Sequence, residues 1–127
     1  MKPEDLLVKR VVTYLRGEYP SIIYNINLAA DMRVSIGVAR KNKALLGKWS
    51  KGHPDMIIYK TNKKYCGLFI ELKATKTVPN SEHTRRQEAF MAILRLQGYR
   101  ATFCCGYEEC VKEIDWYMAL KKKKVKT

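Results

Sequence analysis

Apolar residues recur every three or four positions in three segments of the chain, and they form dense runs in four others. The first pattern is typical of a helix that buries one face, and runs rich in β-branched and aromatic residues are typical of strands. Pro3 suits the first turn of a helix, and Gly17 and Gly98 suit helix ends. The expected elements are helices over residues 3–17, 81–97 and 107–120, and strands over residues 22–26, 55–59, 67–73 and 101–105.

Residues 28–52 show a weaker pattern, in which apolar positions are scattered among six Lys and Arg residues and a single acid, Asp31. We expect a short basic helix over residues 35–46, inside a long connection between two strands. Long connections in compact domains often carry function, and this one is the most basic part of the body of the chain.

The order of these elements predicts the fold class. The strands at 55–59 and 67–73 form an expected hairpin, and helices precede and follow the other strands, so we expect an α/β fold with a central mixed four-stranded sheet flanked by helices. The 127 residues, of which 46% are apolar, suit a single domain over residues 1–120, followed by a basic tail over residues 121–127.

Several protein classes are disfavoured by the composition. No segment approaches the roughly 20 apolar residues that cross a bilayer, and residues 1–5 lack the order of a signal peptide, so we expect a cytoplasmic protein. The four cysteines form no CxxC pair. We therefore expect reduced thiols in the core rather than zinc ligands or disulfides.

The charge balance indicates a polyanionic partner. The chain has 25 Lys and Arg residues against 12 Asp and Glu residues, which gives a formal net charge of +13. A basic surface of this size favours polyanions, and nucleic acid is the commonest of them inside cells. Membrane surfaces and acidic proteins are the alternative partners.

The charged end of the strand expected at 67–73 is unusual. One face of this segment is apolar throughout, whereas the other begins with Phe69 and turns charged at Glu71 and Lys73. A Glu71–Lys73 pair at a solvated sheet edge would explain the pattern. However, the hairpin can bring Asp55, at the start of the preceding strand, close to Glu71, and two buried carboxylates need a compensating charge.

Two helices each have a polar residue on their apolar stripe. Glu4 lies on the stripe of the first helix and Gln87 on that of the helix at 81–97, so we expect both side chains to face inward. An ordinary charge at a helix N-terminus is the alternative for Glu4, with Asp5 as another candidate acid, and a surface amide is the alternative for Gln87.

Three inward carboxylates beside one lysine cannot all stay ionised without a divalent cation. Oxygen ligands suit magnesium or manganese, and a phosphodiester is the natural substrate for such a cation on a basic protein. The residues Glu4, Asp55 and Glu71, with Lys73 beside them, therefore predict a metal site for phosphodiester hydrolysis.

The motif Gly52-His53-Pro54-Asp55, the triplet Glu71-Leu72-Lys73 and the downstream Gln87 resemble the VRR-NUC domain of the PD-(D/E)XK nuclease superfamily, in the stand-alone form common in bacteriophages. The resemblance implies a restriction-endonuclease-like core. It also implies roles for single residues: Mg²⁺ or Mn²⁺ bound by Asp55, Glu71 and the backbone carbonyl of Leu72, water positioned by Lys73, the acidic cluster completed by Glu4, and support from Gln87. We expect His53 to occupy a variable position rather than to touch phosphate, and we assign no role to His83.

The same resemblance implies a structure-specific DNA endonuclease, acting on Holliday junctions or other branched DNA as a homodimer. A dimer would supply the two symmetric active sites that cutting two strands requires. A non-catalytic basic DNA-binding protein on a nuclease-like scaffold and an RNA-processing nuclease are the competing hypotheses.

Overall fold

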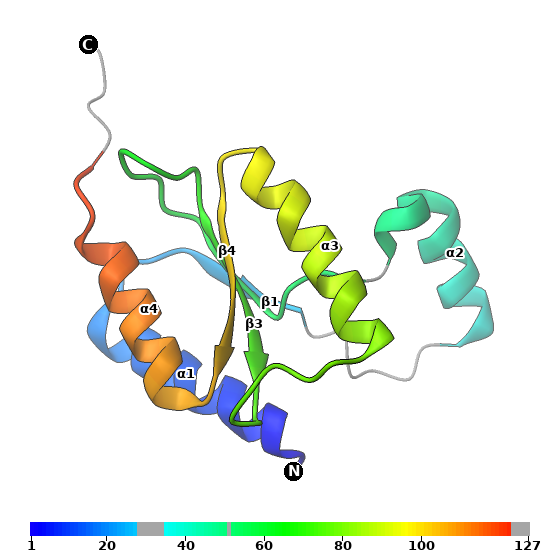
Figure 1. The fold of residues 1–127 in the computed structure, drawn as a ribbon, viewed down its shortest axis with the longest axis horizontal. Helices are drawn as coiled ribbons and strands as arrows, with labels where there is room; N and C mark the ends of the chain where they lie inside the picture. Colours follow the sequence, from blue (N-terminus) through cyan, green and yellow to red (C-terminus); the bar gives the residue numbers. More distant parts are fainter. Residues whose placement is uncertain (28–34, 51, 123–127) are drawn as a thin grey trace.

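The computed structural model describes residues 1–27, 35–50 and 52–122, and within them it shows four α-helices and four strands (Figure 1). The elements are α1 (Pro3–Glu18), β1 (Tyr24–Ile26), α2 (Ile36–Leu46), the 3₁₀ helix η2 (Gly47–Ser50), β2 (Met56–Ile58), β3 (Leu68–Lys73), α3 (Glu82–Leu96), β4 (Arg100–Cys105) and α4 (Tyr107–Ala119). Every helix and strand expected from the sequence is therefore present. The strands β1 and β2 are shorter than predicted.

The four strands form one mixed sheet in the order β1-β2-β3-β4. The pairs β1–β2 and β2–β3 are antiparallel, and the pair β3–β4 is parallel. The helix α3 provides the crossover between the two parallel strands. This arrangement confirms the predicted α/β fold with a mixed four-stranded sheet.

The sequence marks where the helices begin and end. Pro3 is the first residue of α1, and acidic residues occupy its first turn, where they complement the helix dipole. The hydroxyl of Ser81 caps α3 by accepting a hydrogen bond from the backbone N–H of Thr84 at 3.1 Å. After α3, Gly98 adopts a φ of 96°, which a residue with a side chain rarely does, and the chain turns into β4.

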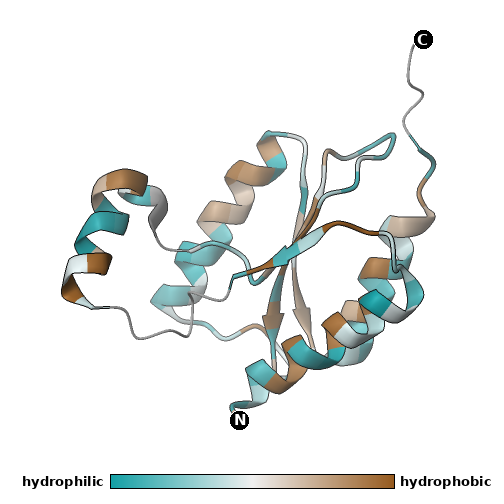
Figure 2. Cartoon of the chain, turned by 180° about the vertical axis from the view of Figure 1, so that it is seen from behind, coloured by the Kyte–Doolittle hydropathy of each residue, from teal (hydrophilic) through white to brown (hydrophobic). Residues whose placement is uncertain are grey.

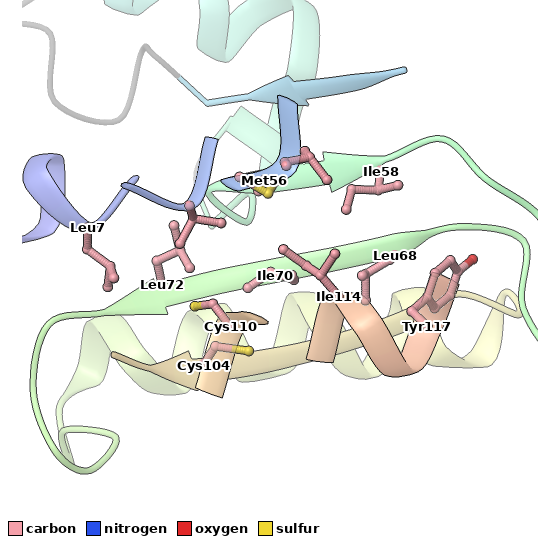
Figure 3. Close-up of a cluster of buried hydrophobic side chains, with 12 residues drawn as sticks. Leu7, Met56, Ile58, Leu68, Ile70, Leu72, Cys104, Cys110, Ile114 and Tyr117 are labelled. Carbon is pink, nitrogen blue, oxygen red and sulfur yellow. The ribbon is translucent and has the colours of Figure 1, made fainter. Parts of the chain in front are cut away.

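Helices cover both faces of the sheet (Figure 1). The helices α1 and α4 lie on one face, and α3 packs on β4 from the other. The core lies under α1 and α4, where side chains from both helices and from β2, β3 and β4 interlock (Figure 3). Its buried members include Val11, Leu15, Ile70, Ile114 and Tyr117. Figure 2 shows hydrophobic and hydrophilic colours alternating along α1 and α4.

The helix α2 is an exposed basic arm. It stands to the side of the sheet, beyond α3 (Figure 1), and every residue from 35 to 48 is exposed. Its basic residues are Arg40, Lys41 and Lys43. The short basic helix predicted for the long connection is therefore confirmed, whereas Asp31, within residues 28–34, lies outside the described residues.

Three further expectations concern the cysteines, membrane-spanning helices and the basic tail. All four cysteines are free; Cys104 and Cys110 are buried as expected, but Cys66 is exposed because it lies in the loop before β3 rather than in the core. No helix in the described residues is both long and apolar enough to cross a membrane. Of the predicted basic tail, residues 123–127 lie outside the described residues.

Candidate active site and metal centre

Two carboxylates meet where β2 begins and β3 ends. The antiparallel register pairs Met56 with Ile70, which places Asp55 opposite Glu71 on the face of the sheet that points away from α1 and α4. The backbone N–H of Asp55 donates to Glu71 Oε2 at 3.2 Å, and the backbone N–H of Leu72 donates to Asp55 Oδ2 at 2.8 Å. Each carboxylate is thus held by the backbone of the opposite strand.

The helix α3 adds an amide that links Glu71 to Lys73. Gln87 Nε2 donates to Glu71 Oε1 at 2.7 Å, and Lys73 Nζ donates to Gln87 Oε1 at 2.9 Å. The distance from Lys73 Nζ to Glu71 Oε1 is 3.9 Å. All three residues are buried, with exposed fractions of 4% for Glu71, 6% for Lys73 and 5% for Gln87. The amide, the carboxylate and the ammonium therefore form one buried network.

The electrostatics of this network are unbalanced. Burial and then the neighbouring Asp55 carboxylate raise the pKa of Glu71 well above its usual range, and the positive charge of Lys73 only partly opposes them. Two carboxylates and one ammonium leave an excess negative charge when all are ionised. A proton or a cation is needed to compensate that charge.

The donor set fits a hard divalent cation. Asp55 and Glu71 supply carboxylate oxygens, and the carbonyl of Leu72 is an oxygen donor at the same strand end. Oxygen donors of this kind are those preferred by Mg²⁺ and Mn²⁺. Asp55 is only partly buried, whereas Glu71 is buried, so a cation held between them would be reached from the solvent side of Asp55.

Glu4, the third acid predicted for the metal site, does not lie with Asp55 and Glu71 in a buried cluster. Glu4 is exposed, so the expectation that it faces the core is wrong. The apolar stripe of α1 becomes buried only from Leu7 onward, and a position on a stripe faces the core only where a neighbouring element covers it. Asp5, the alternative acid, is half-buried and makes contacts. Within the part of the chain that the structure describes, no three His, Cys, Asp or Glu side chains are grouped closely enough to hold a metal.

The comparison with known protein families identifies the family of the chain. The sequence profile of the VRR-NUC domain matches residues 8–108, which include Asp55, Glu71, Lys73 and Gln87 and exclude Glu4. The chain belongs to the VRR-NUC domain family. This membership indicates a nuclease-like function acting on DNA.

A solved structure described as "VRR_NUC domain protein" is similar to this VRR-NUC domain over almost its full length. The two chains are 25% identical with a TM-score of 0.71, and the similarity covers 96% of this chain and 93% of that chain. No curated protein matches the chain.

Two residues of the VRR-NUC domain have structural roles that the sequence did not reveal. Gly52 adopts a φ of 90°, and a Cβ there would lie 3.6 Å from the Phe90 ring, so this position favours glycine close to α3. The ring of His53 packs on the same Phe90, with the ring centres 4.7 Å apart. The two residues before Pro54 thus fix the segment leading to Asp55 against α3. The sequence signal for the turn is a glycine two residues before the Pro-Asp pair, whereas the contact of His53 with Phe90 leaves no sequence signal.

Proposed function

We propose that this VRR-NUC domain is a DNA endonuclease of the PD-(D/E)XK type that hydrolyses phosphodiester bonds with Mg²⁺ or Mn²⁺. The observation that carries the proposal is the pair of Asp55 and Glu71 carboxylates, held opposite each other with the Lys73 ammonium close by and without enough positive charge to balance them. Burying like charges destabilises a fold unless a proton or a ligand compensates them, and a bound divalent cation is the compensation that this proposal assigns to the pair.

Each residue of the network has a distinct task in this proposal. Asp55, Glu71 and the carbonyl of Leu72 would hold the cation, which would supply Lewis-acid polarisation of the phosphoryl group and stabilisation of the leaving oxygen. The Lys73 ammonium would orient the attacking water, and its positive charge would favour loss of the water's proton to the solvent. Gln87 is a positioning residue, because its amide holds both Glu71 and Lys73.

The charge of the chain supports DNA as the substrate. The net charge of +13 favours a phosphate backbone, and the exposed α2 arm carries Arg40, Lys41 and Lys43 without an acidic residue between positions 35 and 50. We propose branched DNA, such as a four-way junction, as the preferred structure. A homodimer would then supply the second site that symmetric cutting of two strands needs.

A cleavage panel tests the activity. Four-way junction, flap, duplex and single-stranded DNA, each with an RNA version, are incubated with the protein and Mg²⁺, Mn²⁺ or EDTA. We expect cutting of the branched DNA with either metal and none with EDTA, and loss of cutting in Glu71→Gln but not in Glu108→Gln, an exposed glutamate at the start of α4. DNA binding without cutting under every condition would instead support a non-catalytic DNA-binding protein.

Sedimentation of the protein with and without junction DNA tests the dimer. A monomer under both conditions would contradict the proposal of two symmetric sites, but it would leave the hydrolytic chemistry of a single site unaffected.

A further inference from the structure

A hollow of about 350 Å³ opens next to the carboxylate pair on the same face of the sheet. Its floor includes Ile57 and Phe69, which are paired across β2 and β3 two residues along from Asp55 and Glu71, and so on the same face of the sheet. The hollow also reaches His53 and Pro54, the residues that lead directly into Asp55. The hollow and the candidate metal centre therefore form one continuous surface.

Aromatic rings and amides line this hollow. Tyr59 is 53% exposed, and Phe69 is held by Tyr99 in an edge-to-face contact with the ring centres 5.1 Å apart. Asn25 and Asn27 lie along the β1 side. The backbone N–H of Asn27 donates to the carbonyl of Asp55 at 2.8 Å, which ties this side of the hollow to the carboxylate pair.

The chemistry of these walls fits a nucleobase. A base has flat apolar faces that stack on aromatic side chains, and polar edges that exchange hydrogen bonds with carboxamides. The lining favours a base over a phosphate group, because Lys and Arg are the usual side-chain partners of phosphate and none of the described residues that line the hollow is either of them. The volume is within the range of about 300–1,000 Å³ that is typical of sites for small ligands.

We infer that this hollow receives one unpaired nucleobase of the DNA strand whose backbone passes Asp55 and Glu71. The inference rests on the proposed function, because it places the strand at the carboxylate pair. A base within a duplex is stacked on both faces and paired with a base of the other strand, so it enters such a hollow only at the cost of being extruded. Nucleotides at a branch point escape much of that cost, which gives the site a physical reason to prefer branched over continuous duplex DNA.

The inference is tested by DNA binding in EDTA, where no cutting occurs. The probe is a forked DNA with a fluorescent label and a single-stranded arm, together with a set in which one abasic residue is moved along that arm. Tyr59→Ala is compared with Tyr59→Phe, which keeps the ring, and with Trp116→Ala, an exposed aromatic residue on α4 at the opposite face of the sheet. Thermal unfolding verifies that each variant folds.

We expect Tyr59→Ala to weaken binding about tenfold, the scale of a single base-stacking interaction, while Tyr59→Phe and Trp116→Ala bind as the wild type does. One abasic position should weaken wild-type binding by a similar factor and have no further effect on Tyr59→Ala. Losses that multiply, or an arm in which no single abasic position matters, would overturn the inference. If Tyr59→Ala does not fold, Asn25→Ala, at an exposed position of the same hollow, is combined with the abasic DNA set in the same way.

Two further measurements separate this inference from its alternatives. A deoxynucleoside monophosphate at millimolar concentration should not displace the forked DNA; Tyr59-dependent displacement without any abasic effect would assign the hollow to a free nucleotide and overturn the inference. If the abasic effect depends on Tyr59 but the protein cuts no DNA with Mg²⁺ or Mn²⁺, the base site is retained and the proposed nuclease activity fails. Failure to bind forked DNA at all would overturn both.

Discussion

Gln87 donates a hydrogen bond to Glu71 Oε1 at 2.7 Å and accepts one from Lys73 Nζ at 2.9 Å, so the amide bridges two charges that are themselves 3.9 Å apart. The alternative interpretation, a Glu71–Lys73 ion pair at a solvated sheet edge, therefore does not hold: the two side chains are buried and are linked through the Gln87 amide. The amide orientation matters, because only the Nε2 of a glutamine can donate to a carboxylate and only its oxygen can accept from an ammonium.

Removing this bridge should destabilise the protein. Gln87→Ala takes a hydrogen-bond partner from two buried charged groups, which costs about 1–3 kcal/mol of unfolding free energy. Urea denaturation in EDTA measures the change. The control is Glu88→Ala on the same helix, which removes an exposed ion pair with Arg95 and should cost less than about 1 kcal/mol. Equal costs in the two variants would show that the buried bridge contributes no more than an exposed ion pair does.

The carboxylate pair should make the metal-free protein less stable as the pH rises. Because the pKa of Glu71 is higher in the folded protein, the folded state binds this proton more tightly than the unfolded state does. The unfolding free energy contributed by Glu71 therefore falls as the pH rises above the ordinary value of about 4.5. Thermal unfolding in EDTA between pH 4.5 and about pH 9, the ordinary and the raised pKa of Glu71, measures how steeply the unfolding free energy falls with pH.

Asp55→Asn is the variant that isolates the pair. An asparagine oxygen can still accept from the Leu72 N–H, and its NH₂ group can donate to Glu71, so the like-charge repulsion is removed while the fold is kept. We expect a shallower pH slope and, near pH 7 in EDTA, a melting temperature higher by roughly 4 °C, equivalent to about 1 kcal/mol in a domain of this size. A slope as steep as that of the wild type would contradict the charge-pair interpretation.

A bound cation should reverse the cost of the pair. With Mn²⁺ or Mg²⁺ at about 100 times its dissociation constant, the folded state gains about 2.7 kcal/mol, so the melting temperature of the wild type should rise with metal concentration. Glu71→Gln should lose that rise, whereas the exposed control Glu108→Gln should keep it. Calorimetric scans with increasing MnCl₂ measure the effect. A rise that persists in Glu71→Gln would place the ion elsewhere.

Lys73 should serve the chemistry rather than the metal. Lys73→Met keeps an unbranched stem near the Phe103 ring but removes the ammonium, so cutting should slow on the order of 10²-fold while the metal-induced rise in melting temperature remains. Single-turnover cleavage at saturating DNA measures the rate. Lys76→Met, in the exposed loop after β3, is the matched control. A normal rate in Lys73→Met would remove the role assigned to this residue.

The sequence was most informative where a pattern repeats along one element. The apolar spacing of α1 and α4 and the alternation in β3 located the core, and Gln87 on α3 is buried as its stripe predicted. The same rule failed for Glu4, because periodicity gives the direction of a side chain but not where the covering element ends. Periodicity also cannot predict contacts between distant segments. The hydrogen bond from the Leu72 N–H to Asp55 depends on the register of β2 with β3. The position of the Gln87 amide between Glu71 and Lys73 depends on where α3 packs.

The α2 arm offers a last test, of how the protein holds DNA. Arg40, Lys41 and Lys43 are exposed on a helix to the side of the sheet, so their contribution to DNA binding should be electrostatic and independent of the carboxylate pair. Removing one cation that neutralises a phosphate should reduce the slope of log affinity against log salt by about 0.9 for duplex DNA. Replacing all three by Gln should therefore flatten that slope by as much as two to three units, on the order of one unit per residue that touches a phosphate.

Binding of duplex and four-way junction DNA between low and moderate salt measures the slope. Lys112→Gln, exposed on α4 at the opposite face of the sheet, is the single-charge control. The triple variant should weaken all DNA structures by similar factors and leave the single-turnover cutting rate at saturating DNA unchanged, because phosphate contacts position the strand without reading bases. A slope unchanged from the wild type would show that the arm does not lie on DNA.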